Sequence, residues 1–197
     1  MIHYKGSPML ETKRLFLRKM EMNDADRMFD YIFSDTRVMD HLIKGPHQSI
    51  SETKARLTEI TQQYESDTFC YWGMVLKESG ELIGTIDLFN FDDDTENCEV
   101  GYDIGYQWWN QGYGTEALQA IVEFAFRMMN IHKISATHGM DNPASGKLME
   151  KVGMKREGII RHMIRKDGQY KDCGIYGILQ EEYVERNAGS YIVNDLS

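Results

Sequence analysis

The sequence predicts an α+β domain with one central mixed sheet and helices packed against it. Hydrophobic periodicity gives the element order β-α-α-β-β-β-α-β-α-β-β, in which a three-stranded meander and a closing hairpin are separated by helices. The 197 residues contain no internal repeat, low-complexity segment or Pro/Gly/Ser-rich linker. We therefore expect a single domain over residues 1–197, with a core at about residues 11–183 and a short C-terminal tail.

The first part of the chain predicts one strand and two helices. Residues 14–19 alternate apolar and polar side chains, as in a half-buried strand. Two amphipathic helices follow, and each begins at residues that favour N-caps. The spacing Ser49-x-x-Glu52 fits a capping box, in which two side chains satisfy free N–H groups of the first turn. The predicted N-caps are Asn23 or Asp24 for the first helix and Ser49 or Ser51 for the second.

The remaining elements follow from alternation, helical spacing and turn residues. Ser79-Gly80 and Asp167-Gly168 are typical of hairpin turns. Gly153 is typical of the residue that ends a helix. The expected strands are residues 69–77, 81–91, 98–106, 133–138, 155–164 and 172–179, and the expected helices are a long one that ends near Met129 and a shorter one at 142–152.

Composition bears on the compartment and the partners. The formal net charge of −9 repels nucleic acid and anionic lipid. It favours a cationic substrate such as an amine, although acidity also serves solubility. Neither a signal peptide nor an apolar run of about 18 residues is present, so no contact with a membrane is expected. The cysteines are odd in number and form no C-x-x-C pair, which indicates a reducing cytoplasm and predicts no metal site; they are Cys70, Cys98 and Cys173.

Two glycines, Gly112 and Gly114, stand between a predicted strand and the long helix. The first N–H groups of a helix have no partner within it, and the positive end of the helix dipole lies beside them. Such a helix start binds phosphate oxygens, and residues without a Cβ let the backbone come close. A plain tight turn is the alternative interpretation. The pattern predicts a phosphorylated cofactor held by Asn110, Gln111, Gly112, Tyr113, Gly114 and Thr115.

Four passages of the chain follow one another in a distinctive order. They are Glu11-Thr12-x-Arg14-Leu15-x-Leu17-Arg18, Glu99-Val100-Gly101-Tyr102, Gly112-Tyr113-Gly114-Thr115-Glu116-Ala117, and Asn142-x-x-Ser145 followed by Glu150-Lys151-x-Gly153-Met154-x-x-Glu157-Gly158. A lone G-x-G is weak evidence, but these passages together span nearly the whole chain. The chain thereby resembles the GNAT superfamily of acetyl-CoA-dependent N-acetyltransferases. It is most similar to the branch that contains the ribosomal-protein N-terminal (alanine) acetyltransferases.

The resemblance implies the acyl-CoA N-acyltransferase fold, whose mostly antiparallel sheet is splayed at its middle strand. It also implies acetyl-CoA as co-substrate, without a metal. In the family the pantetheine arm lies along the splayed strand, which assigns it here to the backbone of Tyr102, Asp103 and Ile104. The family's phosphate loop is written Gln/Arg-x-x-Gly-x-Gly/Ala, and this chain, like its branch, has Trp109 at the first position. Phosphate binding must then rely on backbone N–H groups.

The resemblance also assigns roles to Asn142 and Ser145. The family's Asn hydrogen-bonds the pantetheine, but Asn142 followed by Pro143 is equally a good helix N-cap, and both interpretations can hold together. Ser145, one turn further on, is expected to protonate or hydrogen-bond the departing CoA thiolate. The alternative for Ser145 is a helix serine that bonds its own backbone.

Glu99 is the candidate general base, acting through a water, because this branch usually carries an acidic residue there. A carboxylate in a half-buried cleft has a raised pKa, which suits proton acceptance. A solvated strand glutamate is the alternative. Other members of the superfamily use a Glu and a Tyr at positions that hold Thr137 and Met149 here, so positioning of the two reactants is expected to carry much of the catalysis.

The implied reaction is direct attack of a primary amine on acetyl-CoA, with a protein N-terminal α-amine as the leading acceptor. Acceptor specificity is expected in the two N-terminal helices and their loop, about residues 35–51. An acetyltransferase for a small amine (polyamine, amino sugar or toxin) and a non-catalytic CoA-binding sensor are the alternatives. A nicotinamide-binding domain is excluded, because the glycine loop follows a meander and lacks the third glycine. The sequence leaves monomer and homodimer open.

Overall fold

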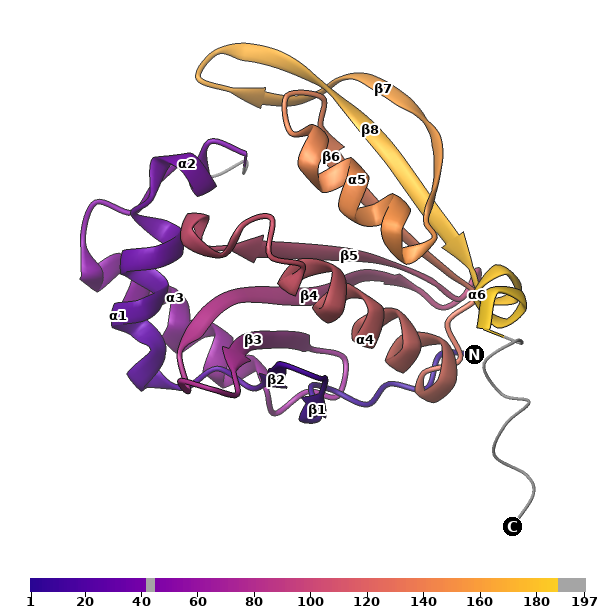
Figure 1. Cartoon of the computed structure of the whole chain (residues 1–197), viewed down its shortest axis with the longest axis horizontal. Helices are drawn as coiled ribbons and strands as arrows, with labels where there is room; N and C mark the ends of the chain where they lie inside the picture. Colours follow the sequence, from indigo (N-terminus) through magenta and orange to yellow (C-terminus); the bar gives the residue numbers. More distant parts are fainter. Residues whose placement is uncertain (42–44, 188–197) are drawn as a thin grey trace.

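A computed structural model describes residues 1–41 and 45–187. The centre of the loop expected to carry acceptor specificity, and the predicted C-terminal tail beyond residue 187, lie outside the described residues. One eight-stranded sheet has the order β1-β2-β3-β4-β5-β6-β8-β7 (Figure 1). Every neighbouring pair is antiparallel except β5 and β6, which are parallel. The predicted mixed, mostly antiparallel sheet is therefore confirmed.

The element bounds follow the predicted order with a few additions. The strands are β1 (Leu10–Glu11), β2 (Leu15–Arg18), β3 (Cys70–Leu76), β4 (Leu82–Asp92), β5 (Asn97–Ile104), β6 (Lys133–Gly139), β7 (Lys155–Lys166) and β8 (Gln169–Leu179). The helices are α1 (Ala25–Met28), α2 (Thr36–Met39), α3 (Ile50–Gln63), α4 (Tyr113–Met128), α5 (Pro143–Val152) and α6 (Gln180–Asn187), with short 3₁₀ or π turns η1 (Met22–Asp24), η2 (Phe29–Phe33) and η3 (Tyr106–Trp108). No helix among the described residues is long and apolar enough to cross a membrane.

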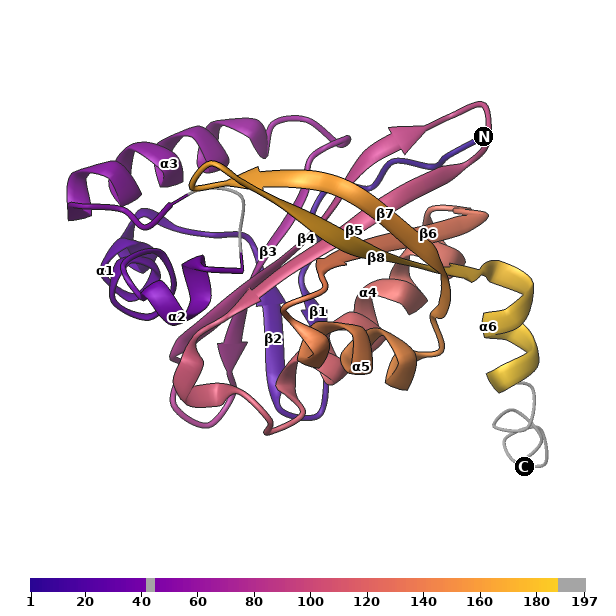
Figure 2. The ribbon, with the colours of Figure 1, turned by 90° about the horizontal axis from the view of Figure 1, so that it is seen from above.

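Helices cover both faces of the sheet, as Figure 2 shows from above. The face toward α4 and α5 carries the larger apolar cluster, in which Trp72 packs edge-on against Phe124 at 5.7 Å between ring centroids. The face toward α1 and α3 carries a second cluster, in which Met28 and Leu57 are fully buried. Burial of apolar side chains on both faces fixes the strand register, because a one-residue slip would turn each side chain to the wrong face.

The sheet splits between β5 and β6. Only Asn97, Cys98 and Glu99 of β5 pair with β6, at Lys133, Ile134 and Ser135. Beyond this point β5 stays with β4 and β6 stays with β8. Because parallel strands end on the same side, α4 and α5 both begin at the open end of the split (Figure 1). The predicted splay at the middle strand is therefore confirmed.

The N-terminal helices differ most from prediction. The first predicted helix is broken into η1, α1 and the π-helical η2, and α2 follows as a separate turn. Asp24, one of the two predicted N-caps, is the N-cap of α1, and Glu21 is the N-cap of the preceding turn η1, where Asp24 accepts the Glu21 N–H at 2.8 Å. Ser49 is the N-cap of α3, but its hydroxyl bonds Ser51 instead of the helix N–H groups, so no capping box forms.

Candidate active site

The loop between β5 and α4 presents a row of unpaired backbone N–H groups. Asn110 (φ 60°) and Gly112 (φ 82°) adopt left-handed conformations, which turn the chain into the start of α4. Within the part of the chain that the structure describes, no backbone or side-chain acceptor bonds the N–H groups of residues 110–115, and Glu116 makes the first helical bond, to Gly112. Together with the helix dipole, this row is a geometry that suits phosphate oxygens. It comprises the predicted residues Asn110, Gln111, Gly112, Tyr113, Gly114 and Thr115.

The two glycines serve different purposes. Gly112 provides the left-handed backbone that most other residues avoid. Gly114 is buried against side chains of the neighbouring elements: a Cβ there would lie 2.6 Å from Leu148 and 2.7 Å from Ile104. The absence of a side chain at Gly114 therefore allows α4 to pack closely against α5 and β5. The sequence alone predicts the approach of a ligand at both glycines, and does not reveal this packing at Gly114.

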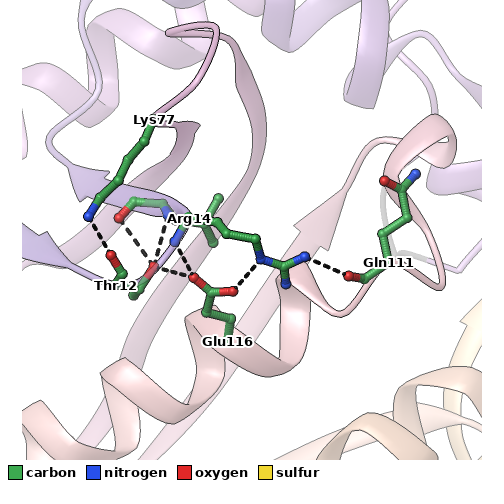
Figure 3. Close-up of polar contacts among 6 residues, drawn as sticks. Thr12, Arg14, Lys77, Gln111 and Glu116 are labelled. Carbon is green, nitrogen blue, oxygen red and sulfur yellow. Dashed lines mark hydrogen bonds and ion pairs between the residues drawn. The ribbon is translucent and has the colours of Figure 1, made fainter.

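A hydrogen-bonded clamp holds the loop from the side of β2 (Figure 3). The Glu116 carboxylate accepts bonds from the Thr12 hydroxyl (2.7 Å), the Arg14 backbone N–H (2.6 Å) and the Arg14 Nε–H (2.7 Å). Arg14 also donates to the Gln111 carbonyl (3.0 Å) and lies 4.2 Å over the Tyr113 ring. Although burial alone would raise it, the bonds from Thr12 and Arg14 hold the pKa of Glu116 below its usual value. We call Thr12, Arg14 and Glu116 the loop clamp.

The loop clamp gives a role to the first family passage, for which sequence reasoning had found none. It also places a cation beside the glycine loop, since a Cβ on Gly112 would lie 3.4 Å from Arg14 Nη2. Trp109, at the position where the family pattern has Gln or Arg, turns away from the loop and donates its indole N–H to the Ile104 carbonyl at 2.7 Å. The loop therefore has a basic side chain beside it, but that side chain is Arg14, from the turn that precedes β2.

The strand register determines which main-chain groups line the split. Gly105 donates to the Ile83 carbonyl at 2.9 Å, and hydrogen-bonded positions alternate along an antiparallel pair. The main chain of Asp103 therefore faces β4, whereas Tyr102 and Ile104 turn their N–H and C=O groups toward the split. The Ile104 carbonyl already accepts a hydrogen bond from the Trp109 indole. Of the three predicted pantetheine positions, Tyr102 and Ile104 have the suitable orientation.

Asn142 and Ser145 stand at the open end of the split, at the start of α5. Asn142 Oδ1 accepts the Ser145 N–H at 3.3 Å, so the N-cap interpretation is confirmed, and any cofactor role would use the other atoms of its amide. The Ser145 hydroxyl lies 2.8 Å from the Tyr102 hydroxyl, across the split. Burial raises the pKa of Tyr102 to about 12, so its hydroxyl stays protonated at neutral pH. Sequence reasoning had used only the backbone of Tyr102 and missed this phenol.

Glu99 lies on the face of the sheet opposite α4 and α5. It is the last residue of β5 that pairs with β6. Its carboxylate accepts a bond from the Asn90 side-chain amide at 3.0 Å. Met149, at the position of the superfamily's Tyr, is buried in the core, and Thr137 lies on β6 next to β8. The base predicted from the sequence therefore lies where the split begins.

Two further carboxyl groups share the face of Glu99. Burial, together with the charge of Asp103, raises the pKa of Asp87 to about 8, and Arg56 on α3 partly offsets this. Burial raises the pKa of Asp103 to about 6, and a hydrogen bond with Thr85 acts against the rise. Perturbed carboxyl groups of this kind cluster at functional sites. Among the described residues, no group of three or more potential ligands is arranged to hold a metal.

Comparison with known proteins agrees with this geometry. Residues 14–155 match the acetyltransferase (GNAT) domain, so the chain belongs to the GNAT acetyltransferase family, whose members use acetyl-CoA. The ribosomal protein uS5-alanine N-acetyltransferase of Escherichia coli (strain K12) is 30% identical, over 83% of this chain and 86% of that protein.

Two further relatives extend the comparison. The spermidine N(1)-acetyltransferase of Vibrio cholerae is 24% identical, over 88% of this chain and 98% of that protein. A GNAT-family acetyltransferase structure from Bacillus anthracis superposes with a TM-score of 0.78 at 28% identity, covering 88% of this chain and 99% of the other. The chain is an N-acetyltransferase of this family.

Proposed function

We propose that this enzyme transfers the acetyl group of acetyl-CoA to the α-amine of a protein or peptide N-terminus. The observation that carries the proposal is the row of unpaired N–H groups over residues 110–115, at the start of α4 and beside a split sheet. A diphosphate fits this row, and a pantetheine arm fits the main chain of Tyr102 and the N–H of Ile104, whose carbonyl already accepts the Trp109 indole. Residues 11–183 then form one catalytic domain.

The chemistry of the amine favours an N-terminal acceptor. A lysine-like amine with a pKa of about 10.4 loses its proton at pH 7 at a cost of about 4–5 kcal/mol. An α-amine, with a pKa of about 7.7–8.0, costs only about 1 kcal/mol. The Escherichia coli relative acetylates an alanine of a ribosomal protein, in line with this choice, whereas the Vibrio cholerae relative acts on spermidine. Spermidine is therefore the second candidate acceptor.

We assign the protonation of the leaving thiolate to the pair Ser145 and Tyr102. Their hydroxyls are 2.8 Å apart at the open end of the split, and Tyr102 keeps its proton at neutral pH. Such proton transfer contributes about 10²–10⁴-fold in rate in other enzymes. Glu99, predicted as the base from the sequence, stays a prediction.

An acceptor panel tests the proposal. The purified enzyme is given acetyl-CoA with a peptide that has a free N-terminal alanine, the same peptide with a blocked N-terminus and an internal lysine, or spermidine. We expect thiol release and a mass gain of one acetyl group with the free N-terminus only. Turnover with spermidine alone would point to the second candidate. Acetyl-CoA binding without turnover on any amine would identify a non-catalytic sensor and contradict the proposal.

A further inference from the structure

The side chain of Asp87 on β4 lies over β5, the middle strand of the split sheet. It pairs with Gly101 of β5, and a Cβ on Gly101 would lie 2.9 Å from Asp87 Oδ1. The carboxylate therefore occupies the space that a side chain at position 101 would fill. This explains why the Glu99-Val100-Gly101-Tyr102 passage needs a glycine. It also places a carboxylate from β4 next to β5, the strand that borders the split.

The Asp87 carboxylate has no stabilising partner. Within the described ranges 1–41 and 45–187 it accepts no hydrogen bond, and protein encloses it except on the side of a groove. The charged or titratable groups around it are Cys70 and Tyr71 on β3, Asp103 and Glu99 on β5, Arg56 on α3, and Glu65, which lines the same groove. Arg56 exerts only a weaker, opposing effect on the Asp87 pKa, behind burial and Asp103. An enclosed carboxylate beside a second one, with no donor, is unfavourable unless a cation joins them.

A groove of about 640 Å³ reaches this carboxylate from the surface. It runs between the end of α3 and the strands β3 and β4, on the face opposite α4. Aromatic side chains and amides line it, which suits an extended chain with a polar end; Gln62, Gln63, Phe69, Tyr71, Phe89 and Asn90 contribute. The glycine loop opens at the start of α4 on the other face. The two reactants would therefore approach the split from opposite sides.

We propose that Asp87, supported by Asp103, receives the ammonium group of the acceptor and takes its proton. This deepens the proposed function and rests on it. The ammonium binds the ionised form of Asp87 and supplies the hydrogen bonds that this carboxylate lacks. One ammonium proton then moves to Asp87, which leaves a neutral amine beside Gly101. The nitrogen lone pair forms the C–N bond while the C–S bond breaks. The Ser145–Tyr102 pair donates a proton to the thiolate and regains one from the second N–H of the nitrogen, and Asp87 returns its own proton to water in the groove.

The match of proton affinities supports an α-amine as the acceptor. Asp87 has a pKa of about 8, close to that of an α-amine, so proton transfer between them is nearly balanced. Proton transfer from a spermidine-like amine to the same carboxylate would be uphill by more than two pK units. Glu99 differs from Asp87 because Asn90 already bonds its carboxylate.

Four variants test this inference. In Asp87→Asn we expect kcat to fall about 100-fold, as for loss of a general base, and calorimetric binding of the free-N-terminus peptide to CoA-saturated enzyme to weaken at least about 10-fold. Binding of acetyl-CoA should not change. Gly101→Ala should have a similar effect, because its Cβ displaces the carboxylate without removing the charge. Asp87→Glu should restore part of the binding. Asp94→Asn, at the exposed turn between β4 and β5, removes the same charge and should behave as wild type.

The outcomes separate this inference from the proposed function. If wild type acetylates the peptide while Asp87→Asn retains both turnover and peptide binding, the role of Asp87 is overturned and the transferase assignment stands. If Glu99→Gln alone loses turnover and peptide binding, Glu99 is the base and the inference is again overturned. If wild type binds neither acetyl-CoA nor the peptide, the proposed function fails and this inference fails with it. Because Asp87→Asn keeps the shape of a carboxyl group that is largely protonated at neutral pH, the variant is expected to fold.

Discussion

The two sides of the split differ in how their polar groups are paired. We call the side of the glycine loop the donor side and the side of Asp87 the acceptor side. On the donor side, backbone N–H groups at the start of α4 are free, and the loop clamp fixes their position through several hydrogen bonds. On the proposed acceptor side, no residue that the structure describes hydrogen-bonds the Asp87 side chain, and its pKa is strongly raised. The comparison shows that paired groups hold the donor side rigid around a row of free N–H groups, whereas the proposed acceptor side has a carboxyl group that a bound ammonium would complete.

The largest effect is expected at Gly114. Its replacement by Val places carbon atoms against Leu148 and Ile104 and pushes the start of α4 away from β5. We expect acetyl-CoA affinity to fall at least about 100-fold, because the N–H row is displaced, a loss of about 2.7 kcal/mol. Titration calorimetry measures it, and circular dichroism checks that the fold is kept. Gly158→Val, where a Cβ meets only Ile175 at 3.8 Å, is the control. Unchanged affinity in Gly114→Val would argue against the donor site.

Tyr102→Phe removes the phenol at the split without changing the backbone that faces it. We expect kcat to fall about 10²-fold, as for the loss of a proton donor, with little change in the KM for acetyl-CoA. Steady-state kinetics at several pH values give both constants. Ser145→Ala should give a smaller loss. If both variants keep the wild-type kcat, the thiolate is protonated by water and the assignment of this pair is wrong.

Glu116→Gln weakens the loop clamp, because the amide cannot accept both bonds from Arg14 with the strength of a carboxylate. We expect the KM for acetyl-CoA to rise about 10-fold, or about 1.4 kcal/mol, while kcat and peptide binding stay the same. Glu123→Gln is a matched control on the same helix, since Glu123 forms an exposed ion pair with Arg127 away from the glycine loop. Equal behaviour of the two variants would remove the loop clamp from cofactor binding.

A separate prediction concerns stability and pH. The native pKa of Asp87 is about 8, against 3.8 in the unfolded chain, so between these values the native state keeps a proton that the unfolded state has lost. Stability from this group is therefore greatest at low pH and falls as pH rises toward 8, by at most about 1.4 kcal/mol per pH unit. Urea unfolding from pH 5 to pH 8 should show a shallower decline in Asp87→Asn than in wild type. Parallel curves for the two proteins would contradict the raised pKa.

Much of the donor side could be predicted from sequence, because its signals are local. Gly112 follows a strand and precedes an apolar helical repeat, and Asn142-Pro143 is a helix start in itself. The element order and the splay of the sheet followed from these passages and from the family resemblance. Even there, the packing role of Gly114 could not be predicted, because its neighbours Leu148 and Ile104 lie elsewhere in the chain.

The acceptor side could not be predicted in this way. Asp87 meets Gly101 only through the register of β4 and β5, and an aspartate within an apolar strand carries no local sign of its burial. The same holds for Tyr102 and Ser145, which are brought together by the split. The N-terminal helices were misjudged because α1, η2 and α2 are held by packing against the second apolar cluster, which short periodic patterns do not reveal.

The most direct test compares CoA with pantetheine, which has the thiol arm but no diphosphate. Calorimetric titration of the wild-type enzyme with each compound isolates the contribution of the N–H row over residues 110–115. We predict that CoA binds at least about 100-fold more tightly than pantetheine, a difference of about 2.7 kcal/mol. Equal affinity for the two compounds, or no binding of CoA, would contradict the claim that the start of α4 holds the diphosphate.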